Sequence, residues 1–125
     1  MENDMGGCPV KQRQATGEQT KNRILTEIEK GLKDIYGTYL RKIVLYGSYA
    51  RGEQTKGSDL DVMVLLDMEK GRIKKYSEQV LDLSVDLTTR YGVVVSIQEH
   101  NIDFFNNWVD TLPFFSNVDR EGVEL

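Results

Sequence analysis

The sequence predicts an α+β fold, a small β-sheet flanked by α-helices, in a single domain. Two short apolar runs, over residues 43–46 and 62–66, are rich in Val, Leu and Ile and are bounded by polar or Gly-rich residues, which is typical of buried strands. Residues 24–35 and 73–91 instead carry apolar side chains at spacings of three and four, as on the buried face of a helix. A chain of 125 residues is long enough to cover such a sheet with helices. We therefore expect one folded domain.

This domain is expected to span residues 18–125. Residues 1–17 are polar, contain Gly and show no hydrophobic period, so they predict a disordered N-terminal tail. The first element of the domain is then an amphipathic helix that begins near Glu18. Gly37 follows at the position where helices commonly end in a left-handed residue. A strand over residues 42–46 comes next, and its nearly continuous apolar character predicts that both faces of the sheet are covered.

A second long helix is expected over residues 67–91, and Gly92 provides its end. Its first turns, over residues 70–75, are basic, which is typical of a solvated helix end and also suits contact with phosphate or with a partner. Residues 93–97 then predict a third strand, because they are largely β-branched and follow a Gly. His100 is expected just beyond this strand, either as a surface or capping residue or in contact with a site.

The C-terminal part is expected to contain two short helices. Asn101 is a favourable N-cap for the first, and Pro113 is favoured at the first position of the second. Residues 122–125 are expected to add a last extended piece. The aromatic side chains near the first of these helices are more typical of a core or an interface than of a cofactor site; they are Phe104, Phe105 and Trp108.

Composition excludes several classes of function. The chain has 16 Lys and Arg against 20 Asp and Glu, a net charge of −4, so it lacks the basic field that strong nucleic-acid binding requires. It has no apolar run near the roughly 20 residues that span a bilayer and no signal-peptide core, so we expect a cytoplasmic protein without a membrane anchor. One cysteine, Cys8, and one histidine, His100, leave no internal disulfide and no two-histidine metal site. Chemistry must therefore rest mainly on carboxylates.

The most informative stretch is residues 43–66, in which a strand turns sharply at Gly47 and Ser48 into a helical turn. Backbone N–H groups at the start of a helix, together with the helix dipole, favour an anion. Gly47 allows a phosphate to approach the backbone closely, and the Ser48 hydroxyl offers one more hydrogen bond. Taken alone, a Gly-Ser dipeptide is equally typical of an ordinary turn.

Asp59 and Asp61 lie two residues apart at the start of the second strand. Their side chains are therefore expected on one face, while Leu60 points into the core. Adjacent carboxylates repel unless a cation neutralises them, and such oxygen ligands suit Mg²⁺ or Mn²⁺. These ions clamp nucleotide phosphates in phosphoryl transfer. In isolation, an Asp-x-Asp pair is also typical of an acidic strand entry.

The combination of the two features is more specific than either alone. The sequence Gly-Ser-Tyr-Ala-Arg-Gly occupies residues 47–52, and Ser-Asp-Leu-Asp occupies residues 58–61, between two apolar strands. In this arrangement the chain resembles nucleotidyltransferases of the DNA polymerase β type. More narrowly, it resembles the minimal nucleotidyltransferases, many of which are antitoxins paired with HEPN-domain toxins. The resemblance covers about residues 24–97.

The resemblance implies a nucleotidyltransferase fold with a mixed sheet, and ATP or another nucleoside triphosphate as substrate. It also implies transfer of a nucleoside monophosphate to a hydroxyl, which in the antitoxin group belongs to a tyrosine of the partner toxin. The residues implied to bind nucleotide are Gly47, Ser48, Arg51 and Ser58, and those implied to be catalytic and to hold Mg²⁺ or Mn²⁺ are Asp59 and Asp61. For Arg51, an ion pair that braces the loop carries equal weight.

One position departs from the family pattern. The family usually supplies a third carboxylate from the middle of the next strand, where it helps to activate the acceptor hydroxyl, and the matching residue here is Ser96. Ser is neither an anionic ligand nor a base at neutral pH. Strand alternation places Gln98 on the face of Ser96 and Glu99 on the other face, unless a bulge intervenes. Three possibilities follow: a two-carboxylate site that turns over, a substitute acid such as Glu99 or Glu53, or a protein that binds nucleotide without transferring it.

Three functions are therefore compatible with the sequence. The leading expectation is a metal-dependent nucleotidyltransferase. The alternative is a catalytically impaired antitoxin, or nucleotide-binding module, that acts by binding its partner. A third is one subunit of a small-molecule nucleotidyltransferase whose acceptor site lies on another chain. All three imply a protein partner, either a HEPN-type toxin or an acceptor subunit.

Overall fold

The structure is a computed structural model, and it describes residues 17–125, so the expected tail lies outside the described residues except for Gly17. The elements follow in this order: α2 (Glu18–Tyr36), η1 (Gly37–Tyr39), β1 (Leu40–Tyr46), α3 (Ser48–Arg51), β2 (Leu60–Leu66), α4 (Lys70–Ile73), η2 (Lys74–Tyr76), α5 (Ser77–Tyr91), β3 (Val95–Asn101), α6 (Ile102–Trp108), α7 (Pro113–Glu121) and β4 (Val123–Glu124). No helix within residues 17–125 combines the length and the apolar character needed to cross a membrane.

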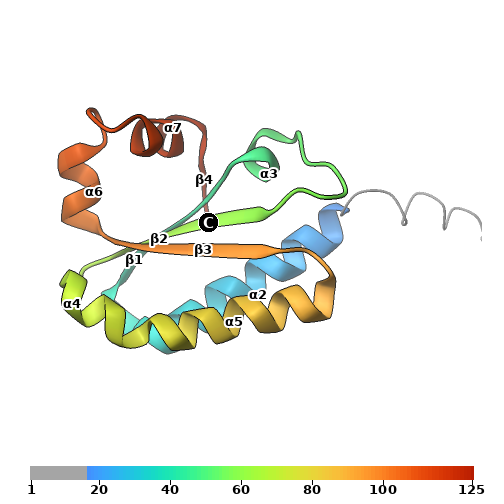
Figure 1. Cartoon of the computed structure of the whole chain (residues 1–125), viewed down its shortest axis with the longest axis horizontal. Coiled ribbons are helices and arrows are strands. Elements are labelled where there is room, and N and C mark those ends of the chain that lie inside the picture. Colours follow the sequence, from blue (N-terminus) through green and yellow to red (C-terminus); the bar gives the residue numbers. More distant parts are fainter. Residues whose placement is uncertain (1–16) are drawn as a thin grey trace, which may run out of the picture.

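The strands form one four-stranded mixed sheet in the order β3-β2-β1-β4. β1 pairs with β2 and with β4 in antiparallel fashion, whereas β2 and β3 are parallel. Figure 1 shows α2 and α5 side by side on one face of this sheet and α6 and α7 on the other. The predicted α+β class, with a mixed sheet flanked by helices, is confirmed.

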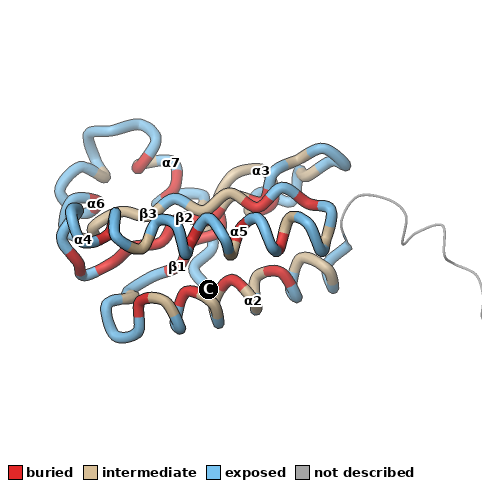
Figure 2. The backbone as a smooth tube through the Cα atoms, turned by 60° about the horizontal axis from the view of Figure 1, so that its bottom comes forward, coloured by how far each residue is buried: buried red, intermediate tan, exposed pale blue. Residues whose placement is uncertain are grey.

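The larger core lies between the sheet and the helices α2 and α5. On α2, the fully buried side chains are Ile24, Ile28 and Leu32, spaced four residues apart, and Figure 2 shows buried positions recurring along this helix about once per turn. Alternate residues of β2 face them, because successive strand side chains point to opposite sides of the sheet; these residues are Leu60, Val62, Val64 and Leu66. This packing fixes the direction in which the intervening residues of β2 must point.

A smaller core covers only part of the opposite face. Met63 and Leu65 of β2 pack there, together with Val44 of β1, against Phe105 of α6 and Phe115 of α7. Asp61 lies on the same side of β2, two residues before Met63, at the end of the strand that this core does not reach. The fold therefore leaves one carboxylate-bearing strand end accessible.

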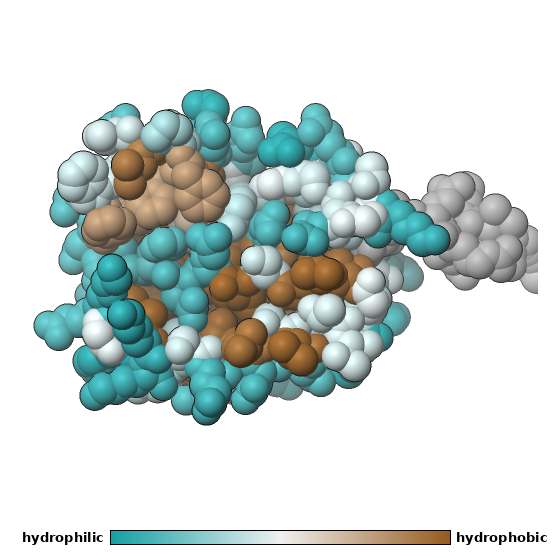
Figure 3. All heavy atoms as spheres, in the orientation of Figure 1, coloured by the Kyte–Doolittle hydropathy of each residue, from teal (hydrophilic) through white to brown (hydrophobic). Residues whose placement is uncertain are grey.

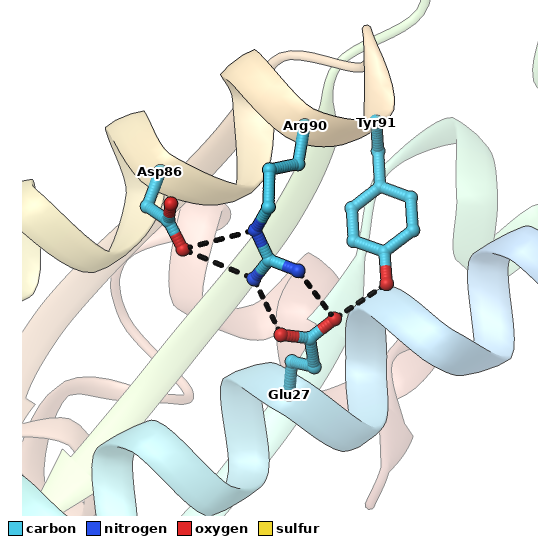
Figure 4. A network of polar contacts seen from close by, with 4 residues as sticks. All are labelled: Glu27, Asp86, Arg90 and Tyr91. Carbon is cyan, nitrogen blue, oxygen red and sulfur yellow. Dashed lines mark hydrogen bonds and ion pairs between the residues drawn. The ribbon is translucent and has the colours of Figure 1, made fainter.

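A polar network joins the two long helices (Figure 4). Arg90 of α5 donates to Glu27 of α2 at 2.5 and 3.2 Å and to Asp86 at 3.0 and 3.2 Å. The Tyr91 hydroxyl donates to the same Glu27 carboxylate. These hydrogen bonds, first from Arg90 and then from Tyr91, lower the pKa of Glu27 below its ordinary value. The network thus stabilises the contact between α2 and α5 whenever Glu27 is ionised.

We expect Glu27→Gln to lower the free energy of unfolding by about 0.5 to 1 kcal/mol at neutral pH, the range of a partly exposed ion pair. Because folding lowers the pKa of Glu27, the stabilisation is present above the pKa of the unfolded chain and disappears as pH falls through the lowered value. Urea unfolding of both proteins from pH 7 to pH 3 measures this difference.

The matched control for that experiment is Glu29→Gln, on the same helix. Glu29 forms an ion pair with Lys33, one turn further on, at 3.2 Å. Such an exposed helical pair contributes about 0.3 kcal/mol. A loss of stability in Glu27→Gln that is no larger than in Glu29→Gln, or that does not change with pH, contradicts the role assigned to the network.

The helix expected over residues 67–91 is interrupted, which corrects the sequence prediction. Residues 67–69 are not helical, and α4 is separated from α5 by the 3₁₀ turn η2. The Asp67 N–H donates to the Tyr39 carbonyl, which holds the chain near the end of β2, and the Ser77 hydroxyl donates to the Lys74 carbonyl at the break. The apolar spacing did not reveal the break, because side chains three residues apart stay aligned through a 3₁₀ turn.

The third strand also differs from its predicted range of residues 93–97. β3 begins at Val95 and continues to Asn101, so His100 lies within the strand rather than just beyond it. Its second half is polar, because β3 is an edge strand whose outer side pairs with no other strand of residues 17–125. The other C-terminal predictions are confirmed: the Asn101 side chain accepts from the Phe104 N–H at 2.9 Å, Pro113 begins α7, and β4 forms the last extended piece.

Candidate functional site

The predicted phosphate turn lies directly between β1 and α3. Gly47 adopts φ 77° and ψ −157°, a conformation that is essentially restricted to glycine. A Cβ atom at this position would lie 2.8 Å from Oδ2 of Asp61, so the backbone at Gly47 and the carboxylate of β2 are in close approach. Gly47 is therefore required both by its backbone conformation and by its neighbour.

The turn is held by its own backbone. The Gly47 carbonyl accepts from the N–H groups of Ala50 at 3.0 Å and Arg51 at 3.2 Å. The chain leaves α3 through Gly52, which is left-handed with φ 71°. Ser48 is the first residue of α3 and is half-buried. The first N–H groups of a helical turn have no partner within the helix, so they are available to an anion placed next to Asp61.

The two carboxylates lie at the start of β2. Asp59 precedes the strand and is exposed, Asp61 is half-buried, and Leu60 between them is fully buried in the larger core. Burial raises the pKa of Asp61, and the negative charge of Asp59 raises it further. The two groups are therefore close enough to repel each other, and a cation between them relieves both the repulsion and the cost of burial.

Register places one residue on each side of Asp61. Ser96 of β3 is its partner in the parallel pair, and Tyr46 of β1 is its partner in the antiparallel pair. Burial raises the pKa of Tyr46 to about 12, with a further contribution from the charge of Asp61. Tyr46, Asp61 and Ser96 thus form a row across three strands, on the face that α6 and α7 only partly cover.

The remaining acids do not complete this row. The pairing of β2 with β3 continues without a shift from Asp61 and Ser96 to the end of both strands, so no bulge turns Glu99 toward the site. Glu99 is the partner of Val64, whose side chain faces α2 and α5. His100 lies four residues beyond Ser96, with its ring 5.1 Å from that of Phe115. Ser96 is therefore the residue of β3 beside Asp61.

Arg51 and Ser58 are engaged by the loop between α3 and β2. Arg51 donates to Glu53 at 2.8 Å and to Glu121 of α7 at 3.4 Å, and the hydrogen bond that it donates to Glu53 contributes most to raising its pKa. The Ser58 hydroxyl accepts from the Thr55 N–H at 2.8 Å, and the Ser58 N–H donates to the Thr55 carbonyl at 3.0 Å. Both residues brace the loop that joins the turn to the Asp pair.

The donor set fits a magnesium or manganese ion that is shared with a substrate. Within residues 17–125, no group of three or more His, Cys, Asp or Glu side chains gathers in a way that could hold a metal by itself. Mg²⁺ is commonly bound by one or two carboxylates together with substrate phosphates. Asp59 and Asp61, next to the anion-binding turn, match that mode.

Tyr46 is a site residue that the sequence interpretation missed. It is the last residue of β1 and immediately precedes Gly47. Its position beside Asp61 follows from the antiparallel pairing of β1 with β2, which the sequence did not specify. The available signal was its place at the strand end next to a Gly-Ser turn.

Comparisons with known proteins agree with this geometry. A family model described as "Nucleotidyltransferase domain" matches residues 25–109. A protein of Methanocaldococcus jannaschii whose name places it among the protein adenylyltransferases is 33% identical over 108 residues, which cover 84% of this chain and 97% of that protein. "Protein adenylyltransferase MntA" of Thermococcus cleftensis is 36% identical over 72 residues, or 54% of this chain and 71% of that protein.

The solved structures agree at the level of the fold. A chain from a structure described as "Crystal structure of the toxin-antitoxin with AMP-PNP" superposes with a TM-score of 0.52 at 21% identity. The superposition covers 79% of this chain and 69% of that chain. At this level of identity, the similarity shows a shared fold.

Proposed function

Because the chain belongs to the nucleotidyltransferase domain family, in its minimal type, we propose that it transfers AMP from ATP to a hydroxyl acceptor with the help of a divalent metal ion. The observation that carries this proposal is the close approach of Gly47 to Asp61, with Asp59 close enough to raise the pKa of Asp61. A backbone anion site and a pair of repelling carboxylates at one strand end suit a metal-bound triphosphate.

In this proposal, Gly47 and Ser48 hold the triphosphate, and Asp59 and Asp61 hold Mg²⁺ or Mn²⁺. The ion supplies charge neutralisation of the phosphates and of the developing transition state. Arg51 and Ser58 contribute to nucleotide binding by fixing the loop over residues 52–58. Fixing this loop keeps the turn and the Asp pair in one arrangement, which favours reaction because the reacting groups are already positioned.

The reaction also requires a base that removes the proton of the acceptor hydroxyl. Ser96 stands beside Asp61 and cannot accept a proton at neutral pH. Asp61 is the carboxylate of this row, so an oxygen of Asp61 that does not bind the metal is the group placed to accept the proton. We therefore propose a two-carboxylate site in which Asp61 serves both as metal ligand and as the nearest base.

We further propose that the acceptor is a tyrosine of a HEPN-type partner toxin. Two observations support this choice: the relatives are named protein adenylyltransferases, and the fold is shared with a chain of a toxin-antitoxin structure. The experiment is transfer of label from α-³²P-ATP to a purified HEPN-domain toxin that forms a complex with this chain, with Mg²⁺ or Mn²⁺. Label on a partner tyrosine is the expected result, and the absence of label with either ion overturns the proposal.

A second candidate function is neutralisation of the partner by binding alone. Ser96 at the position beside Asp61 favours it, since the row lacks a third carboxylate. Co-expression separates the two functions: if the Asp59→Asn/Asp61→Asn protein still neutralises the toxin, binding is sufficient. If the doubly substituted protein no longer neutralises the toxin but still forms the complex in a pull-down, neutralisation depends on nucleotide transfer.

Ser96→Asp is expected to raise the transfer rate by about 10²-fold, the lower end of the range for a positioned general base. The new carboxylate would stand beside Asp61 in the register of β2 and β3. Single-turnover kinetics with labelled ATP measures the change. Gln98→Asp is the matched control, because it adds the same charge on the same face but beside Met63. Equal effects of the two substitutions contradict a specific role for position 96.

A further inference from the structure

A pocket lies at the end of β3 that is remote from Asp61. Figure 1 shows α4 and α6 on either side of this strand end. The pocket has a volume of about 460 Å³, within the range of small-molecule sites, and it is lined by Lys70, Ile73, Lys74, Ser77, Glu99, His100, Asn101 and Phe104. The position next to Asp61 in β3 is Ser96, and His100 lies four residues further, roughly 13 Å along the strand. The pocket is therefore separate from the candidate active site.

The pocket contains two uncompensated cations. Lys70 and Lys74 are one helical turn apart and both line it. Neither forms an ion pair with a carboxylate of residues 17–125. In a chain with a net charge of −4, this local pair of lysines favours an anionic group, and the Ser77 hydroxyl lies on the same wall.

The facing wall offers an apolar, planar surface. The Phe104 side chain is 46% exposed, and its ring is supported edge-on by Phe115 at 5.9 Å. In Figure 3, apolar atoms gather over α6 and α7 on this side of the molecule. Burial, and then the positive charge of Lys70, lowers the pKa of His100, which favours the neutral form of its ring. Phe104 and His100 thus provide a surface on which a flat ring packs.

Glu99 adds a hydrogen-bond acceptor to the lining of the pocket. Its carboxyl is half-buried, and burial raises its pKa. No side chain within residues 17–125 donates a hydrogen bond to it. A ligand that brings an N–H or O–H group satisfies this acceptor.

We propose that this pocket binds a nucleoside monophosphate as a second, non-catalytic ligand. Its phosphate group contacts Lys70 and Lys74, its base packs against Phe104, and an N–H or O–H group of the ligand donates to Glu99. Each part of the ligand matches one feature of the pocket: a pair of cations, a flat apolar wall and a carboxyl acceptor. This site is additional to the proposed transfer and does not depend on it.

Trp108, the single tryptophan of the chain, provides a local probe, because its ring lies 6.3 Å from that of Phe104. AMP is titrated into the full chain in EDTA, so that no metal-bound nucleotide contributes, and binding is followed by tryptophan fluorescence and by calorimetry. Saturable binding of AMP is expected, with adenosine and inorganic phosphate each binding more weakly, because each lacks one of the two main contacts.

The decisive comparison uses neighbouring lysines. Lys70→Ala/Lys74→Ala is expected to raise the AMP dissociation constant by about tenfold or more, the effect of losing charged hydrogen bonds. Lys75→Ala removes the same charge from the same segment outside the pocket and is expected to change it by less than about twofold. All three side chains are exposed, so the folded state is retained. No saturable binding of AMP, or an equal loss in both variants, overturns the proposal.

Discussion

Asp61→Asn is expected to lower the rate of nucleotide transfer by about 10²- to 10³-fold, the loss seen when one charged stabilising group is removed from a transition state. Asn keeps the size of the side chain and the contact with Gly47, but it removes the negative charge to which we assign metal binding and proton acceptance in the proposed reaction. The proper measurement is single-turnover transfer from α-³²P-ATP to the partner, with saturating metal, which separates chemistry from product release.

The same substitution is expected to leave the folded state intact, or to raise its melting temperature slightly. Folding raises the pKa of Asp61, through burial first and the charge of Asp59 second, so ionised Asp61 destabilises the folded chain in the absence of metal. Asn removes that cost. Thermal unfolding in EDTA therefore distinguishes a lost catalytic group from a damaged fold, since activity and stability change in opposite directions.

Asp82→Asn is the matched control, because Asp82 is an exposed carboxylate on α5, away from the site. It is expected to change neither transfer nor melting temperature. Transfer by Asp61→Asn at a rate within threefold of the unmodified chain contradicts the assignment, and the same reasoning applies to Asp59→Asn. A large drop in the melting temperature of Asp61→Asn contradicts the account of its pKa.

Local signals predicted most elements of this fold. Three of these signals act on neighbouring residues, so they can be recognised in the sequence alone. They are the four-residue spacing of apolar residues on α2, the capping side chain of Asn101 and the proline at the start of α7. The break near Ser77 and the polar second half of β3 depend on tertiary contacts. The chain between β2 and α5 is held by Tyr39, and β3 is polar because its outer edge pairs with no other strand of residues 17–125.

The same division explains how much of the candidate site could be foreseen. The prediction of Gly47, Asp59 and Asp61 as site residues rests on their spacing along one stretch of chain, which a single sequence displays. Tyr46 beside Asp61 was not found, because it requires the pairing of β1 with β2. The ion pair between Arg51 and Glu121 joins residues 70 positions apart, so no local sequence pattern predicts it. Register and long-range pairing are the information that a single sequence does not display.

Gly47→Ala is expected to have the second large effect, and it acts on stability and activity together. The φ and ψ angles of Gly47 lie in a region that side chains avoid, which costs about 1 to 3 kcal/mol for alanine. In addition, the new Cβ would meet Oδ2 of Asp61 at 2.8 Å, so the carboxylate must move away from the position in which it faces the turn. We expect urea unfolding to show a loss of about 2 to 3 kcal/mol, and transfer to fall below detection.

Gly52→Ala separates the two contributions. Gly52 also has a positive φ, 71°, but nothing lies within 4 Å of a Cβ built there, so alanine is expected to cost about 1 kcal/mol through backbone conformation alone. A double-mutant cycle then isolates the contact with the carboxylate. If the new Cβ clashes with the carboxylate, Asp61→Gly relieves part of the destabilisation caused by Gly47→Ala. If the effects of the two substitutions on the free energy of unfolding are additive, backbone conformation alone explains why position 47 requires glycine. Coupling between them therefore tests directly whether the phosphate turn and the metal-binding strand form one site.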